Sequence, residues 1–423
     1  MARCDTCFEA WQHNRTWHLV SRPPHANVIC GKWVFCHKTR PDGSLERYKA
    51  RWVVRGFRQC AGVDFIDTFA PVVKPGTTRT MLQLAVSRAW PVHQLYVSNA
   101  FLHGHLAEKV FCESSTGFAD AEHPTRGSVF PFSLRVEAGA PSVGASIAYL
   151  LLYVDDIILM ASPPELLQQL TARLRDEFAL KDLGALYYFL GIEVVHRTDG
   201  FFLHQQKYAH ELLERVGMLN CKPASTSVDT KVKVSALEGS TAPDAAFYHF
   251  IVGAFQYLTL TRPDLQYAVQ QVCLHMHVPR DSQWTLVKRI LLYIHNPMTL
   301  GLTLAASAST DIVAYSDDDW VGCPNTHRST SGYFVYLGPS LISWSSKRQP
   351  MISRSSGEAE YHVVANAVAE CSWLHQLLQE LLCEVHKAMT VYCDNVSAVY
   401  LSANPVHHCR TKHIELAIHF VRE

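Results

Sequence analysis

The chain has 423 residues, 48% of them hydrophobic and 18% charged, and its 38 basic and 38 acidic residues give a formal net charge of zero. This composition predicts a globular protein of two to three domains, and it excludes a disordered or a broadly basic protein. Thirteen cysteines, an odd number, occur without a signal peptide or a long apolar span. We therefore expect a reducing intracellular location, cytoplasmic or nuclear and not secreted, with no disulfides and no membrane partner.

The N-terminal residues offer one weak metal-site pattern and one strong hairpin pattern. Cys4 and Cys7 are followed by His13 and His18, but this spacing fits no common zinc finger. Within residues 31–57, apolar and basic residues alternate on both sides of a Pro-Asp-Gly turn, which predicts a two-stranded hairpin. Residues 32–58 hold two acids and eight basic residues: Lys32, Lys38, Arg40, Arg47, Lys49, Arg51, Arg55 and Arg58. Two interpretations stay open, a phosphate-facing surface and a solvated charged face.

The next stretch alternates between structured and weakly patterned segments. Residues 80–88 have helical periodicity and lead into HQLYVSNAFLHGHL at 93–106. Residues 119–146 are rich in Ala, Gly, Ser and Pro and show weak periodicity, so they predict no regular element.

Two adjacent aspartates interrupt an apolar run at 149–160, YLLLYVDDIILM. The run predicts a buried strand, and burying Asp155 beside Asp156 is costly because each carboxylate loses water and the two repel. Two divalent cations at the tip of a β-hairpin would compensate them, which indicates a two-metal site for nucleotidyl transfer. A plain hairpin turn is one alternative and a membrane span is another, the second disfavoured by the two central charges.

Residues 164–295 predict helices, together with one strand and one linker. Residues 164–179 have helical periodicity, residues 181–195 indicate a turn and a strand, and residues 203–218 form an amphipathic pattern with Gly217 near its end. Residues 222–243 are rich in Ser, Thr, Pro and Lys and indicate a linker. Three further helical segments are predicted at 247–260, 263–277 and 282–295.

Acidic residues in the last hundred positions occur where strands end and where a helix begins. Asp317 follows a strand pattern that starts at Ile312, Glu358 and Glu360 open a helical segment, and Asp394 follows another strand pattern. Separated acids on strand ends and on a facing helix are typical of a two-metal nuclease. A solvated acidic face is the alternative.

The residues Tyr153-Val154-Asp155-Asp156 resemble the YVDD box of reverse transcriptases, and phrases from Trp17 to Arg422 resemble the copia type of LTR retrotransposon. The resemblance implies an α+β fold, with reverse transcriptase fingers and palm over 1–221, a helical thumb-connection over 222–300 and an RNase H-like domain over 311–423. It implies RNA-directed DNA polymerisation from dNTPs on a primer-template, and cleavage of the RNA strand of an RNA/DNA hybrid. The implied cofactor is Mg²⁺, or Mn²⁺ in its place.

The resemblance also assigns roles to individual residues. The phrase RYKAR at 47–51 makes Lys49 and Arg51 contacts to the incoming triphosphate or template. Phe101 matches an aromatic that excludes a ribose 2′-hydroxyl, with an ordinary core phenylalanine as the alternative, and Tyr153 completes the substrate-binding set. The phrases YVDD, AYSDDDW, SSGEAEY and YCDN supply the catalytic and metal-binding carboxylates: Asp155, Asp156, Asp317, Glu360 and Asp394, with Glu358 as the alternative glutamate.

Three departures from the family pattern lower the expected activity. Tyr96 stands where the family has the third polymerase carboxylate, and a neutral phenol cannot bridge two Mg²⁺ ions. No LYGLKQAPRAW-like pocket phrase occurs near 119–148. The chain ends at Glu423, before the strand and helix that carry the fourth RNase H carboxylate, and Glu415 is a poor substitute.

We expect a degenerate copy with an inactive polymerase, and the alternatives are a non-catalytic nucleic-acid-binding remnant and a residual RNase H-type nuclease. Its oligomeric state stays open.

Overall fold

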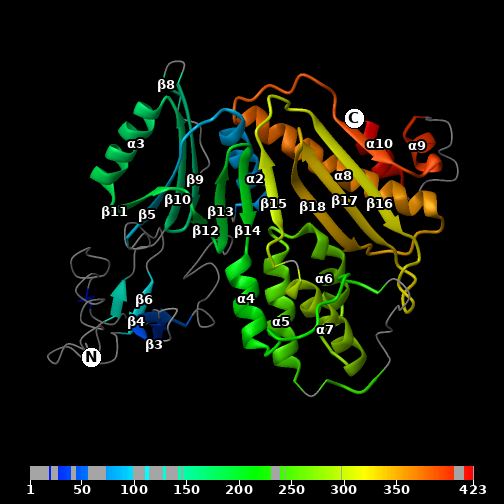
Figure 1. The fold of residues 1–423 in the computed structure, drawn as a ribbon, viewed down its shortest axis with the longest axis horizontal. Helices are drawn as coiled ribbons and strands as arrows, with labels where there is room; N and C mark the ends of the chain where they lie inside the picture. Colours follow the sequence, from blue (N-terminus) through cyan, green and yellow to red (C-terminus); the bar gives the residue numbers. More distant parts are fainter. Residues whose placement is uncertain are drawn as a thin grey trace.

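The fold was analysed in a computed structural model of residues 1–423 (Figure 1). The structure describes residues 19–20, 27–39, 44–55, 73–98, 110–113, 127–129, 142–143, 146–229, 239–242, 244–296, 298–403 and 414–422. Phe101, Cys4, Cys7 and most of residues 119–146 lie outside these ranges. Strands and helices occur in mixed order along the chain, which confirms the predicted α+β class.

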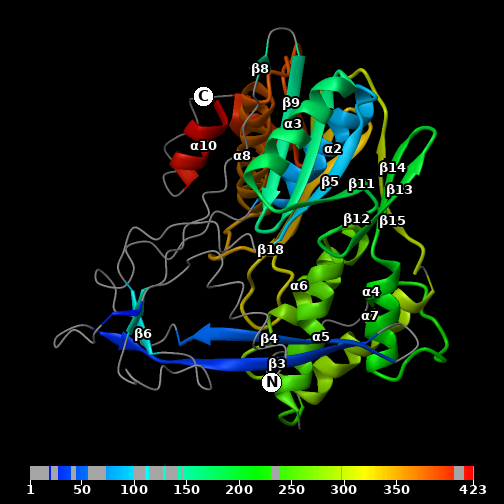
Figure 2. The ribbon, with the colours of Figure 1, turned by 90° about the vertical axis from the view of Figure 1, so that its left-hand side faces the viewer.

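A long hairpin dominates the N-terminal part. Strands β3 (Gly31–Thr39) and β4 (Leu45–Val54) pair antiparallel, and Figure 2 shows them at the same end of the molecule as the helices α5 and α7. A second, small sheet has the order β1-β7-β6-β2. Its strands are β1 (Leu19–Val20), β2 (Val28–Ile29), β6 (Phe111–Glu113) and β7 (Gly127–Val129).

The central sheet has the order β11-β5-β10-β9-β8. Its strands are β5 (Val92–Val97), β8 (Ser142–Val143), β9 (Ser146–Tyr153), β10 (Asp156–Ser162) and β11 (Leu180–Ala185). Successive side chains of β10 point to opposite faces. Ile157 and Leu159 pack with helix α3 (Pro164–Glu177), whereas Ile158 and Met160 pack in the core that contains helix α2 (Pro75–Ser87).

A third sheet leads into a helical bundle. Strands β12 (Tyr188–Phe189), β13 (Ile192–Arg197), β14 (Gly200–His204) and β15 (Gly301–Ala305) pair in that order. The bundle contains α4 (Gln206–Arg215), α5 (Ala245–Leu258), the 3-10 turn η3 (Pro263–Leu265), α6 (Gln266–Cys273) and α7 (Asp281–His295). The helix expected over 203–218 starts later than predicted, because Leu203 and His204 pair with β15.

The C-terminal sheet has the order β18-β17-β16-β19, with β16 and β19 parallel. Its strands are β16 (Ile312–Asp319), β17 (Thr330–Leu337), β18 (Ser340–Arg348) and β19 (Thr390–Cys393). The long helix α8 (Ser356–Glu380) crosses this sheet, and the shorter helices α9 (Val396–Ala403) and α10 (Glu415–Arg422) pack beside it (Figure 1).

One apolar core joins the central and C-terminal sheets. It includes Ile158 of β10 and Val335 of β17, and polar contacts reinforce it. Arg79 of α2 is 8% exposed, stacks on the Trp344 ring at 3.8 Å and donates to the Leu260 carbonyl at 2.8 Å. The Tyr149 hydroxyl donates to the Leu381 carbonyl at 2.7 Å. These parts therefore pack as one body. Among the helices that the structure describes, none is both long and apolar enough to cross a membrane.

Candidate functional site

Asp155 and Asp156 lie at the turn between β9 and β10. Tyr153 pairs with Asp156, so Val154 and Asp155 form the two-residue connection. Val154 has φ +57°, the left-handed conformation that tight hairpin turns require. The Val97 N–H donates to the Asp155 carbonyl at 2.8 Å, which fastens the turn to β5. The apolar arms thus hold both carboxylates at one end of the central sheet.

Tyr96 lies directly opposite Asp156 in the pairing of β5 with β10. Paired residues project to the same face of a sheet, so the Tyr96 side chain lies on the face of Asp156, as does that of Tyr153 on the other neighbouring strand. Burial raises the pKa of Asp156, the charge of Asp155 raises it further, and a hydrogen bond from Gln94 lowers it. The buried Oε1 of Gln94 has no hydrogen-bond partner. Two adjacent carboxylates would attract one cation, and the neighbouring strand offers them a hydroxyl instead of a third acid.

A second acidic site, here called the C-terminal acid cluster (Asp317, Glu360 and Asp394), forms where the parallel pairing of β16 with β19 ends. Ser316 of β16 pairs with Cys393, the last residue of β19, so Asp394 follows that strand end while Asp317 continues in β16 opposite Gly332 of β17. Glu360 reaches the same place from α8, and its Oε1 accepts a hydrogen bond from the Asp318 N–H at 3.0 Å. Asp317, Glu360 and Asp394 thus come together although they are 34 or more positions apart in the chain.

The electrostatics of the cluster favour a bound cation. Burial raises the pKa of Glu360 to about 7, with further contributions from the negative charges of Asp394 and Asp317. Burial also raises the pKa of Asp318 to about 6, although Ser331 donates to its Oδ1 at 3.2 Å. Carboxylates that resist ionisation beside one another are stabilised when a cation shares their charge.

Cys393 is a donor that the sequence reasoning missed. One donor atom each from Glu360, Cys393 and Asp394 lie within 4.8 Å of one another, and the Cys393 Sγ is 3.7 Å from the Glu360 Oε2. A tetrahedral Zn²⁺ with a Zn–S distance of about 2.3 Å and a Zn–O distance of about 2.0 Å separates sulfur and oxygen by about 3.5 Å. The phrase YCDN contained the signal, because the cysteine directly precedes the strand-end aspartate.

Glu358 occupies a different position from Glu360. The Ser355 Oγ accepts a hydrogen bond from the Glu358 N–H at 3.2 Å, and the Glu358 Oε2 accepts one from the Arg354 N–H at 2.9 Å. This reciprocal arrangement resembles a capping box, which the sequence Ser-x-x-Glu at 355–358 could have predicted. Glu358 thus closes the first turn of α8, and Glu360 is the glutamate that lies with Asp394.

The remaining predicted residues lie elsewhere or outside the described residues. Lys49 and Arg51 are in β4, where they pair with Cys36 and Val34 of β3. Their side chains are outside the described part, as is the side chain of Glu415. Tyr153 is partly buried beside the Asp155 turn.

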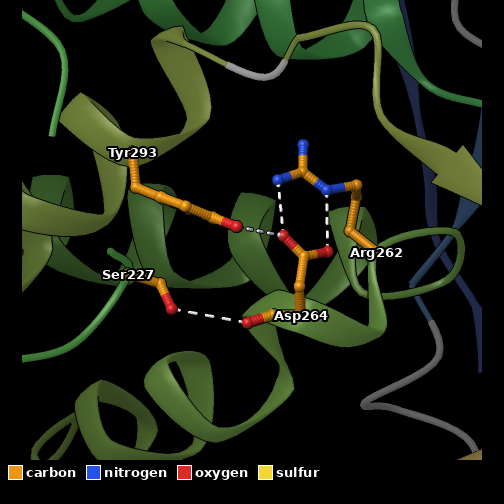
Figure 3. A network of polar contacts seen from close by, with 4 residues as sticks. All are labelled: Ser227, Arg262, Asp264 and Tyr293. Atoms are coloured by element: carbon orange, nitrogen blue, oxygen red, sulfur yellow. Dashed lines mark hydrogen bonds and ion pairs between the residues drawn. The ribbon is translucent and has the colours of Figure 1, made fainter. Parts of the chain in front are cut away.

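An ion pair between a buried arginine and a more exposed aspartate connects parts of the helical bundle (Figure 3). Arg262 is 3% exposed and binds Asp264 in a bidentate manner, Nε to Oδ1 at 2.9 Å and Nη2 to Oδ2 at 2.7 Å. Tyr293 of α7 donates to Oδ2 at 2.9 Å, and the Ser227 hydroxyl donates to the Asp264 carbonyl at 3.4 Å. Burial acts to raise the pKa of Asp264, but the contacts with Arg262 outweigh it and the pKa is lowered. The network ties η3 to α7 and to the 227–229 segment.

Comparisons with known proteins fit this geometry. A family model described as "Reverse transcriptase (RNA-dependent DNA polymerase)" matches residues 14–130 and 141–230. The chain is 41% identical to the retrovirus-related Pol polyprotein from transposon RE2 of Arabidopsis thaliana, over 97% of the chain and 30% of that protein. It is 36% identical to the retrovirus-related Pol polyprotein from transposon TNT 1-94 of Nicotiana tabacum, over 98% of the chain and 34% of that protein.

A third relative is an uncharacterized mitochondrial protein of Arabidopsis thaliana, 47% identical over 53% of the chain and 93% of that protein. The chain spans about a third of the length of the Pol polyproteins that it matches. The resemblance drawn from the YVDD box and its neighbours is confirmed. The chain belongs to the reverse transcriptase (RNA-dependent DNA polymerase) family, as represented in the Pol polyproteins of copia-type transposons.

Proposed function

We propose that this chain is a reverse transcriptase-type protein that binds nucleic acid but does not polymerise DNA. One observation carries the proposal: Tyr96 lies opposite Asp156, where a third carboxylate would complete the metal-binding set. Asp155 and Asp156 alone would hold Mg²⁺ or Mn²⁺. When bound, such ions activate a 3′-hydroxyl and stabilise the leaving pyrophosphate. The phenol of Tyr96 adds no negative charge near neutral pH, so the donor set suits one cation better than two.

Primer extension tests this proposal. With a poly(rA)/oligo(dT) primer-template, dNTPs and either Mg²⁺ or Mn²⁺, we expect no extension by the purified chain, because the transferring phosphate loses much of its electrostatic stabilisation. A Tyr96→Asp variant should bind Mn²⁺ more tightly than the wild type, measured by calorimetry. Extension by the wild type that disappears in Asp155→Asn would contradict the proposal.

Nucleic-acid binding is assigned to the β3–β4 hairpin. Residues 32–58 carry eight basic residues against two acids. Each phosphate contact contributes roughly 0.9 to the slope of log K against log[salt] on duplex DNA. We expect a Lys49→Ala, Arg51→Ala double variant to reduce both the affinity for primer-template and this slope. Lys222→Ala with Lys288→Ala removes two exposed lysines outside the hairpin and serves as the control. Equal losses in both pairs would show that the hairpin is only a solvated charged face.

The C-terminal acid cluster supports a second candidate function, RNase H-type cleavage of an RNA/DNA hybrid. The supporting observations are that Glu360 and Asp394 offer ligand atoms within 4.8 Å of each other, and that the charge of Asp317 on the adjacent strand β16 also acts on Glu360. These residues would hold Mg²⁺ or Mn²⁺, which lowers the pKa of a bound water and makes it a nucleophile at neutral pH. Mn²⁺ is the less demanding of the two ions in its ligand geometry, so faint cleavage is expected in Mn²⁺ and none in Mg²⁺.

A further inference from the structure

A pocket of about 520 Å³ lies where the helical bundle meets the C-terminal sheet. Helices α6 and α7 contribute one wall, and the connection between β16 and β17, together with the end of β18, contributes the other. Its volume falls within the range of ligand pockets, roughly 300–1,000 Å³, and such pockets favour junctions between packed units. None of the residues assigned above to metal binding lines it.

Two arginines line the pocket without a carboxylate partner. Among the described residues, neither Arg328 nor Arg348 takes part in an ion pair. The Arg348 Nη2 donates to the Gln271 Oε1 over 3.4 Å, a long hydrogen bond, and its buried Nε has no hydrogen-bond partner. A buried donor that lacks a partner costs about 1–3 kcal/mol, and more when the group is charged. The pocket therefore holds a guanidinium with unused capacity to donate.

The other charged and titratable groups that line the pocket do not cancel the positive charge of the two arginines. Asp229 forms an ion pair with Arg289 at 3.4 Å, so its charge is balanced. Asp319 accepts a hydrogen bond from the Tyr267 hydroxyl at 3.4 Å. Burial and the nearby Arg348 lower the pKa of His275, which therefore stays neutral at neutral pH. The unbalanced charge in the pocket is the positive charge of the two arginines, offset in part by Asp319.

The location of the pocket identifies the source of the anion. Asp319 lines the pocket and lies two residues beyond Asp317 on β16, so the pocket adjoins the C-terminal acid cluster. A strand of nucleic acid held at that cluster carries a phosphate at every nucleotide. Guanidinium groups bind phosphate through parallel N–H donors, and Arg328 and Arg348 approach the pocket from two different segments.

We propose that this pocket binds a backbone phosphate of the nucleic acid strand that lies across the C-terminal acid cluster. The anionic oxygens would satisfy the Arg348 Nε and pair with Arg328, and the exposed Tyr267 ring would face the adjoining sugar or base. This inference rests on the proposed binding of nucleic acid.

The test compares three single variants of the full chain. Binding of a fluorescent RNA/DNA hybrid is measured by anisotropy between about 50 and about 200 mM salt. Arg348→Gln and Arg328→Gln should each weaken binding several-fold and lower the salt slope by roughly 0.9. Lys347→Gln is the matched control, because Lys347 is the exposed neighbour of Arg348 on β18 and does not line the pocket. Lys347→Gln should change the affinity for the hybrid and the salt slope less than either arginine variant does. Arg328 is exposed, so its variant keeps the test valid even if Arg348→Gln unfolds.

Further measurements distinguish binding of a nucleic acid backbone phosphate from binding of free phosphate or a nucleotide. Inorganic phosphate and dAMP are titrated into the wild type and monitored by ³¹P NMR line broadening. Broadening that is lost in Arg328→Gln, with hybrid binding unchanged, would indicate a site for free phosphate and overturn the backbone assignment. Unchanged hybrid affinity and slope in both folded arginine variants, or the same loss in Lys347→Gln, would also overturn it. A wild type that binds no hybrid at about 50 mM salt would refute the proposed function itself.

Discussion

The two acidic sites of this molecule are built alike but differ in their third donor. In each, two aspartates lie near the end of a strand pairing: Asp155 and Asp156 at the β9–β10 turn, and Asp317 and Asp394 just beyond the last paired residues of β16 and β19. At the C-terminal acid cluster, α8 adds the buried carboxylate Glu360. At the β9–β10 turn, the strand β5 adds the phenol of Tyr96.

The difference shows that a third acid changes the chemistry of the other two. Negative charges from two sides, together with burial, raise the pKa of Glu360 to about 7. At the β9–β10 turn, the pKa of Asp156 is raised by burial and by the charge of one acid, Asp155. We therefore expect the stronger demand for a cation at the C-terminal acid cluster, and three experiments test this expectation.

The largest effect should come from removing an acid of the cluster. Glu360→Gln and Asp394→Asn should each reduce the faint Mn²⁺-dependent cleavage of an RNA/DNA hybrid to background, since each removes charge that stabilises the reacting phosphate. Calorimetric Mn²⁺ affinity gives a second readout. Glu358→Gln is the control, because it changes the α8 cap two residues away and should cost only about 1 kcal/mol of stability. Equal losses of cleavage in Glu358→Gln and Glu360→Gln would contradict the assignment of their separate roles.

A smaller effect is expected in the pH dependence of stability without metal. The folded-state pKa of Glu360, about 7, lies above its ordinary value, so the native state binds more protons than the unfolded state between about pH 4.5 and 7. The free energy of unfolding should therefore fall as pH rises through this window, by at most about 1.4 kcal/mol per pH unit for this group.

Urea titrations from about pH 4 to 8 measure this slope. Asp318, with its pKa of about 6, acts in the same direction, so Glu360→Gln should flatten the curve without abolishing its slope. Asp394→Asn should move the midpoint to lower pH. A stability that rises between about pH 5 and 7 would contradict the inferred electrostatics.

The smallest effect concerns the choice of metal. A cysteine sulfur beside Glu360 favours Zn²⁺ over Mg²⁺ as the bound metal. Cys393→Ser should weaken Zn²⁺ binding about tenfold while leaving Mn²⁺ binding within about twofold, measured by calorimetry. Cys273→Ser, a partly buried thiol in α6, is the control. Equal Zn²⁺ affinities in the two variants would show that Cys393 is not a ligand.

Much of each site follows from local sequence patterns. The apolar run around Asp155 and Asp156 predicted a buried strand with the two acids at the tip of a hairpin, and the strand patterns around Asp317 and Asp394 predicted acids at strand ends, which holds for Asp394, whereas Asp317 lies within β16. Hairpins and strand ends are local features, so residues near in sequence determine them. The confirmed α+β class rests on the same patterns.

Contacts between distant residues could not be predicted in this way. That Tyr96 pairs with Asp156, 60 positions away, depends on the strand order of a whole sheet. Cys393 was passed over because one cysteine has no spacing pattern, and its distance to Glu360 depends on how α8 crosses the sheet. The pocket lined by Arg348 requires the packing of the bundle against β18, which no local pattern indicates.

Arg79 makes distant parts of the chain depend on one another. Its side chain touches Trp344 of the C-terminal sheet and the Leu260 carbonyl beyond α5, and burial lowers its pKa to about 9. If the contact with Trp344 or the hydrogen bond to Leu260 is lost, the buried guanidinium of Arg79 loses a partner while helix α2 stays in the core. A lesion that unravels the C-terminal sheet therefore also loosens the core that this sheet shares with α2 and the central sheet. A loss of stability in one of the two sheets is thus not confined to that sheet.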